Sequence, residues 1–155
     1  MGAVLMAPNV TLAGAIKSVI ESLGLGVSAY RDMAPPKAVL PFCVITEGVA
    51  WNVVPMGDTD VSSELTIREQ VQVDIYQGLR AADGTRTENP DLEDLVCFAL
   101  QQSKLPTWVS VVYGVMILTR STQTDQAQTN LRRTIVTLQV DRLLDAPAAR
   151  ERIRR

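Results

Sequence analysis

The chain has 155 residues, of which 46% are apolar and 21% charged, and its formal net charge is -2. This length and composition are typical of one globular domain with a sizeable core. They exclude a chain that is disordered throughout and a domain that is strongly basic over its whole surface. The last residues, Asp145 to Arg155, hold four arginines against one aspartate and one glutamate. The sequence therefore predicts one mildly acidic domain at 1–144 and a basic C-terminal tail at 145–155.

The first predicted element is a helix that begins after Asn9, a residue type common at helix N-caps. Its apolar side recurs at helical spacing and comprises Leu12, Ile16, Val19, Ile20 and Leu23. Two glycines end this helix, and a short strand is predicted at 27–30. The pair Pro35-Pro36 then breaks regular structure and starts a loop.

A second strand is predicted at 42–46, and its pattern continues to Val53 before a proline ends it. The polar stretch 56–64 is rich in turn-forming residues, which predicts the tip of a hairpin. Three acidic side chains in this stretch would suit a cation site, namely Asp58, Asp60 and Glu64. Because the stretch lacks the EF-hand pattern, a solvated turn is the preferred interpretation.

The clearest strand pattern runs from Leu65 to Tyr76. Apolar side chains alternate with polar ones, as in a strand with one buried and one wet face. Glu69 is the exception, because it falls on the apolar side. Either a β-bulge or a contact with a partner would explain it, and the sequence leaves both open.

A second helix is predicted to start at Asn89-Pro90 and to end near Ser103. Its acidic first turns, with Glu93 among them, are explained by the helix dipole. The predicted buried side comprises Leu92, Leu95, Val96, Ala99 and Leu100.

The stretch Trp108–Leu118 is apolar on both faces of a predicted strand. Such a strand is buried on both sides, by a second layer or by another subunit. Val112, Met116 and Leu118 share one of these faces and are the candidate subunit contacts. A polar stretch at 121–129 predicts a second hairpin tip, and the last long strand is predicted at 131–142.

Strands dominate, and the two helices do not alternate with them one for one. This order predicts an α+β fold, an antiparallel β-sheet with two main helices packed on one face and with long β-hairpins.

The residues that commonly carry catalysis are scarce. The chain has no histidine, which excludes serine and cysteine triads that need one and most zinc sites. Lys17 and Lys37, the two lysines, are expected to be solvated. Cys43 and Cys97 are expected to be buried free thiols, with a disulfide as the less favoured alternative. We therefore expect no enzyme activity, no metal and no cofactor.

Arg132 and Arg133 begin the last strand, near Arg120 across the predicted hairpin. They would form either a basic patch or, in the preferred interpretation, a charged strand edge that resists aggregation. No segment is long enough and apolar enough to span a membrane.

With its elements in place, the chain resembles the tail terminator (tail completion) proteins of long-tailed bacteriophages over roughly residues 9–144. The matching pieces, in chain order, are LAGAIKSVIESLG, LPFCVITEG, EQVQVDIYQ, ENPDLEDLV and LRRTIVTLQVDRLL. The resemblance is one of element order and pattern, since the family has no invariant catalytic signature. It does not extend to the basic tail.

The resemblance implies a ring, usually hexameric, assembled in the host cytoplasm and located at the head-proximal end of the tail tube. Such a ring stops tube polymerisation, joins the tail to the head connector or neck protein, and lets DNA pass without specific binding. The expected partner contacts are Asp58, Thr59, Asp60, Gln123, Asp125, Gln126, Arg132 and Arg133. The alternatives are another neck, connector or minor tail protein, or a small ligand-binding α+β domain.

Overall fold

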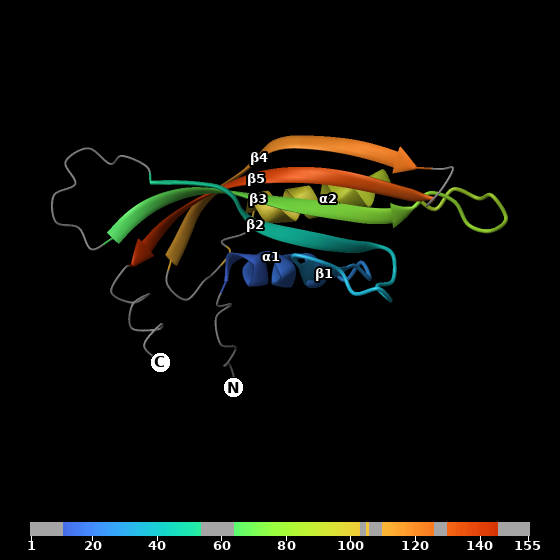
Figure 1. Ribbon diagram of the computed structural model, residues 1–155, viewed down its shortest axis with the longest axis horizontal. Coiled ribbons are helices and arrows are strands. Elements are labelled where there is room, and N and C mark those ends of the chain that lie inside the picture. The colour runs from blue at the N-terminus through green and yellow to red at the C-terminus, as the bar shows by residue number, and fades with distance from the viewer. Residues whose placement is uncertain (1–10, 54–63, 103–104, 106–109, 126–129, 146–155) are drawn as a thin grey trace, which may run out of the picture.

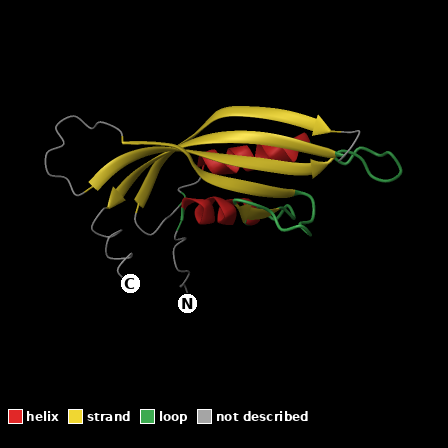
Figure 2. Ribbon diagram, viewed as in Figure 1, coloured by secondary structure: helices red, strands yellow, loops and turns green. Residues whose placement is uncertain are grey.

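A computed structural model describes residues 11–53, 64–102, 105, 110–125 and 130–145. In chain order the elements are α1 (Leu12–Glu21), β1 (Ser28–Arg31), β2 (Phe42–Val53), β3 (Glu64–Gly78), α2 (Pro90–Gln102), β4 (Ser110–Asp125) and β5 (Leu131–Asp145). The strands form one sheet in the order β1-β2-β3-β5-β4, and both helices pack on the same face of it (Figures 1 and 2). The predicted α+β class is confirmed.

Three of the four strand pairings are antiparallel, but β1 pairs with β2 in parallel. Parallel neighbours usually need a long crossover, often a helix. Here β1 has only four residues, so the loop at 32–41 is long enough to carry the chain back along it.

The N-cap of α1 is Thr11, whose hydroxyl oxygen accepts a hydrogen bond from the amide of Gly14 at 2.9 Å. The predicted cap, Asn9, lies outside the residues that the structure describes. Threonine serves because its hydroxyl reaches the free amide three residues further along the helix.

The core lies between the two helices and the inner face of the sheet. The alternation predicted for the third strand is confirmed, since Val71, Val73 and Ile75 of β3 are fully buried beside Val136 and Leu138 of β5. Burying such side chains supplies the main favourable term in folding, at about 25 cal/mol per Å² of apolar surface.

The inner side of α2 differs from the predicted one. Leu95 is exposed, and Glu93 and Cys97 are buried in company with Leu92, Val96 and Leu100. The spacing of apolar residues predicts Leu95 on the buried side and Glu93 on the exposed side. The helix is instead rotated so that the Glu93 carboxylate meets polar partners on the sheet.

Glu69, the exception on the apolar side of β3, is buried and paired within the chain. One carboxylate oxygen accepts from Arg142 Nη2 at 2.8 Å, and the other accepts from the amide of Gly48 at 3.3 Å. Gly48 lies where the register of β2 shifts against β3, and its φ of 71° suits a glycine. A bulge in the neighbouring strand therefore accounts for this glutamate.

Strand β4 carries two irregularities, between Val112 and Gly114 and between Ile117 and Thr119. The first one shifts the alternation, so Val112 faces the core together with Val115 and Ile117. The assignment of Val112 to the same face as Met116 is therefore wrong. Met116 is 51% exposed and lies on the other face of the sheet.

Beyond the helices, β2 to β5 continue as an arm of the sheet (left in Figure 1). Three large apolar side chains are exposed at the distal end of β2, namely Val49, Trp51 and Val53.

The two sides of β4 should respond differently to an introduced carboxylate. We expect Val112→Asp to lower the free energy of unfolding by at least about 2 kcal/mol, because a charge without a partner is costly in a core. Met116→Asp, on the exposed side, should change it by less than about 0.5 kcal/mol. Urea denaturation of both variants measures this, and equal losses would contradict the register shift.

Candidate functional site

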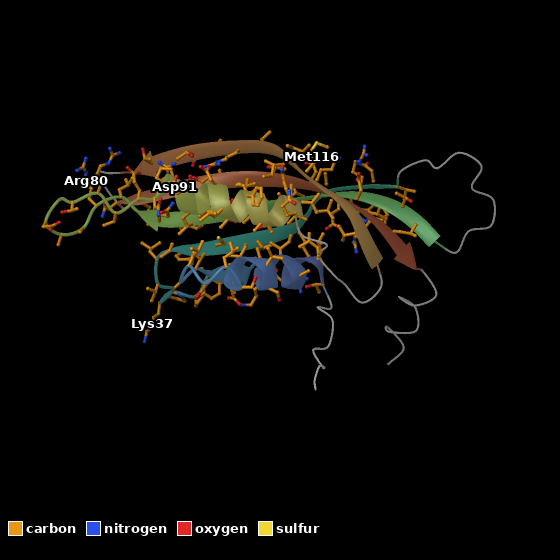
Figure 3. The ribbon with its side chains drawn as sticks, turned by 180° about the vertical axis from the view of Figure 1, so that it is seen from behind. Lys37, Arg80, Asp91 and Met116 are labelled. Carbon is orange, nitrogen blue, oxygen red and sulfur yellow. The ribbon has the colours of Figure 1, made fainter. Side chains whose placement is uncertain are left out.

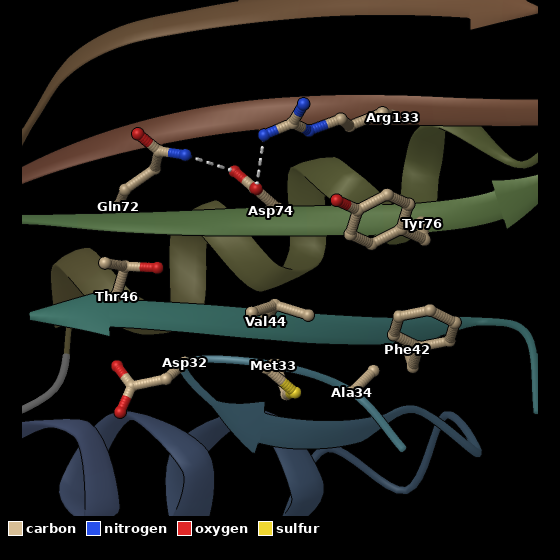
Figure 4. Close-up of a pocket in the computed structure, with 10 residues that line it drawn as sticks. All are labelled: Asp32, Met33, Ala34, Phe42, Val44, Thr46, Gln72, Asp74, Tyr76 and Arg133. Atoms are coloured by element: carbon tan, nitrogen blue, oxygen red, sulfur yellow. Dashed lines mark hydrogen bonds and ion pairs between the residues drawn. The ribbon is translucent and has the colours of Figure 1, made fainter. Parts of the chain in front are cut away.

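Neither of the two described helices lies over the second face of the sheet, and this uncovered face holds a shallow pocket of about 410 Å³ (Figure 4). Its floor is formed by neighbouring strands and its rim by the start of the loop at 32–41. The lining residues are Asp32, Met33, Ala34, Phe42, Val44, Thr46, Gln72, Asp74, Tyr76 and Arg133.

Three polar side chains of this pocket pair with one another, although Arg133 Nε is buried without a hydrogen-bond partner. Asp74 accepts from Arg133 Nη2 at 2.7 Å and from the Gln72 amide at 2.9 Å. Register explains the cluster, because Phe42 lies opposite Tyr76, and Tyr76 lies opposite Arg133. The rings of Phe42 and Tyr76 stack at 5.0 Å, and the Arg133 guanidinium lies 5.8 Å from the centre of the Tyr76 ring. Among the described residues that line the pocket, no nucleophile is hydrogen-bonded to a general base.

A second charged cluster lies between α2 and the sheet. Glu93 is 0% exposed, and its two carboxylate oxygens accept from Arg132 Nε at 2.7 Å and from Arg132 Nη2 at 2.9 Å. Further hydrogen bonds come from Arg120 at 3.1 Å, from the Thr134 hydroxyl at 2.8 Å and from the Gln77 amide at 3.0 Å. The hydrogen-bond acceptor capacity of the Glu93 carboxylate is therefore used by side chains of its own chain.

Burial raises the pKa of Glu93, but hydrogen bonds from Arg132 and Thr134 and the charge of Arg132 outweigh it. The pKa therefore lies below its usual range, and Glu93 is ionised at neutral pH. The helix dipole alone, which was the sequence explanation, does not account for a buried carboxylate.

Arg132 and Arg133, adjacent in sequence, point to opposite faces of the sheet and bind different carboxylates. Strand β5 lies between β3 and β4 and is not an edge. Both sequence interpretations of the pair, the basic patch and the charged edge, are therefore wrong.

The remaining candidate contacts divide into three groups. Gln123 is exposed on β4 opposite Arg133, and Asp125 ends that strand opposite Leu131. Met116 and Leu118 are exposed on β4. Four residues lie outside the part of the chain that the structure describes: Asp58, Thr59, Asp60 and Gln126.

The two edges of the sheet differ. At the β1 edge, Lys17 Nζ donates to the carbonyl of Ala29 at 3.0 Å, and the Glu21 carboxylate accepts from the Ala29 amide at 3.2 Å. Both lie on α1, so the helix caps the free backbone groups of the edge strand, and Lys17 is not merely solvated as expected. At the opposite edge, Thr119–Asp125 pairs regularly with β5, and residues 119–124 are all exposed. Capping of this kind blocks strand addition at β1.

Both cysteines are buried free thiols, as expected. Burial is the main cause that raises the pKa of Cys43 to about 12, and burial also raises the pKa of Cys97. Within the described ranges, no three histidine, cysteine, aspartate or glutamate residues are grouped to hold a metal ion. Nor does any described helix have the length and apolar character needed to cross a membrane.

Comparison with known proteins gives a fold and no family. No family model matches the chain, and no curated protein matches it either. Among solved structures, a chain from the virion of a native gene transfer agent (GTA) particle is similar, with a TM-score of 0.50 and 12% identity. The match covers 81% of this chain and 84% of that one. At this identity the likeness shows that the two chains share a fold.

Replacing the buried glutamate should be far more harmful than replacing its exposed neighbour. We expect Glu93→Gln to lower the free energy of unfolding by about 3–5 kcal/mol, because the half-buried Arg132 loses its closest carboxylate and keeps only Glu88 at 3.4 Å. Asp94→Asn removes only an exposed ion pair with Arg120 and should cost about 1 kcal/mol or less.

The pH dependence has a defined sign. The folded-state pKa of Glu93 is lowered. Ionised Glu93 therefore makes its full contribution to the free energy of unfolding above the unfolded-state pKa of about 4.3. That contribution is lost as the pH falls through the folded-state pKa. Urea denaturation between pH 7 and pH 3 should thus show a smaller acid loss for Glu93→Gln than for the wild type. Equal acid losses would contradict this assignment.

The thiols should be inert in the native protein. With Cys43 at a pKa of about 12 and both side chains buried, a thiol reagent at pH 8 should label neither cysteine until denaturant is added, and then label both. Rapid labelling of native protein would show that one of them is accessible.

Proposed function

We propose that the chain is a structural virion protein of the tail terminator type. In this role it forms a ring at the head-proximal end of a phage tail tube, ends tube polymerisation and joins the tail to the head connector. It acts by assembly and not by catalysis. The fold shared with a chain of the gene transfer agent virion supports the virion role.

The distribution of exposed apolar side chains is the observation that carries the proposal. The described residues include eleven large apolar side chains that are exposed. Leu25, Met33 and Val39 lie before β1 or in the loop after it, whereas Leu40 of that loop lines a pocket with Asn89 and Leu92. The others lie on the outer side of α2 (Leu95 and Phe98), on β4 (Met116 and Leu118) and on the arm of β2. Unlike apolar surfaces on different parts of one chain fit head-to-tail contacts, which close into rings.

The charges of the uncovered face agree with a channel through which DNA passes. Arg133 pairs with Asp74 there, and Arg68 pairs with Asp141 at 2.9 Å. Arginines that are already paired with carboxylates release few counterions on meeting phosphate, so they add little affinity for DNA. This supports passage of DNA without specific binding.

The shallow pocket keeps a second candidate, a small-ligand-binding domain. A saturable rise in melting temperature with a small ligand would favour that candidate. Asp74 is already hydrogen-bonded to Gln72 and to Arg133 Nη2, so these groups are engaged and less able to orient a ligand.

The experiment is to measure the mass of the purified chain by light scattering and to add it to growing tail tubes. We expect a hexameric ring, formed at high concentration or on the tube, and tubes capped at one end that stop lengthening. An unrelated α+β protein of similar size serves as the control. A strictly monomeric chain that neither binds nor caps tubes would overturn the proposal.

A further inference from the structure

The loop at 32–41 between β1 and β2 has a defined shape but exposes apolar side chains. The amide of Met33 donates to the carbonyl of Arg31 at 2.8 Å, and that of Ala38 donates to Pro35 at 3.0 Å. Yet Met33 is 76% exposed and Val39 is 78% exposed. A preorganised loop loses little entropy on binding, so its exposed apolar side chains fit a protein contact.

The outer side of α2 has a matching character. Asp91, Leu95 and Phe98 follow one another at helical spacing on the side away from the sheet, and Phe98 is 65% exposed. The inner side of α2 already contacts the core and carries Glu93 with its hydrogen-bond partners. An aromatic side chain exposed to this extent is a favourable anchor for a partner.

These two surfaces lie on different sides of one chain. The loop follows β1, the strand at one edge of the sheet, whereas Leu95 and Phe98 lie on the side of α2 away from the sheet. A head-to-tail contact between two copies uses one surface of each, so each copy keeps its other surface free for the next.

The charges of the two surfaces are complementary. Lys37 of the loop makes no ion pair with any residue in the described ranges, and the Asp91 side chain likewise has no ion-pair partner among them. Figure 3 shows both residues towards the same end of the long axis. If the copies of a ring are related by rotation about an axis parallel to the strands, each residue keeps its position along that axis. Lys37 of one copy then lies at the same level as Asp91 of the next.

The backbone of β1 favours side-chain contact over a continuous sheet. Lys17 and Glu21 already occupy the carbonyl and amide of Ala29, so the β4 strand of another copy cannot add there. Copies that meet at this edge must use the loop instead.

We propose that the loop at 32–41 of one copy packs on the outer side of α2 of the next copy, with Met33 and Val39 against Leu95 and Phe98 and with Lys37 facing Asp91. The proposal rests on the ring function above and names the surfaces that build the ring.

The test compares oligomeric mass over a range of concentrations for the full chain and its variants. Met33→Asp and Phe98→Asp should each weaken association by about thirtyfold, as expected when an apolar anchor is lost from a contact. Both positions are exposed, so far-UV circular dichroism and the urea midpoint should stay at wild-type values.

A charge exchange tests the orientation. Lys37→Glu and Asp91→Lys should each weaken association. The double variant should restore it, because the two positions then carry exchanged but still opposite charges. Asp83→Lys makes the same charge change as Asp91→Lys on a fully exposed turn outside both surfaces, and it should leave association unchanged.

The outcomes separate the two proposals. A wild type that forms rings, with variants at Met33 and Phe98 that form them equally well, overturns the assigned surfaces and leaves the ring function standing. If the single charge variants fail and the double variant is no better, the pairing of Lys37 with Asp91 is wrong. A wild type that neither forms rings nor caps tubes overturns the ring function and this contact with it.

Discussion

A fully buried carboxylate sets how the helical layer sits on the sheet. Glu93 lies on the inner side of α2, and its partners Arg132 and Thr134 lie on β5, with Arg120 on β4. An ionised carboxylate is stable in such a place only when hydrogen bonds and opposite charge replace water, and here five hydrogen bonds do so. This constraint fixes the rotation of α2 about its axis. It therefore also decides that Leu95 and Phe98 point into solvent.

The same principle, local satisfaction of polar groups, shapes the rest of the surface. Asp74 and Arg133 neutralise each other on the uncovered face, and Glu69 and Arg142 do so at the arm. Lys17 and Glu21 cap the backbone of β1. Large apolar side chains remain exposed beside these pairs, on the loop after β1, on the outer side of α2, on β4 and on the arm of β2. Exposed apolar surfaces beside paired charges are suited to assembly, which is the basis of the proposed ring.

Sequence patterns succeeded where a single periodicity decided the outcome. The order of elements and the inner side of β3 follow from spacing alone, and both are confirmed. Patterns failed where an irregularity intervened. One shift between Val112 and Gly114 moved Val112 into the core, and the glutamate on α2 displaced Leu95 from the buried side. No local signal marks a β-bulge, because it depends on how the neighbouring strand pairs.

The sequence by itself determined the α+β class, the element order and the absence of histidine, since these follow from composition and from spacings of a few residues. Only the tertiary structure decided which carboxylates are buried, which arginine faces which side of the sheet and which edge is capped. The physical reason is distance along the chain. Arg132 meets Glu93 across 39 positions and Arg133 meets Asp74 across 59, and such pairs exist only once the strands have taken their register.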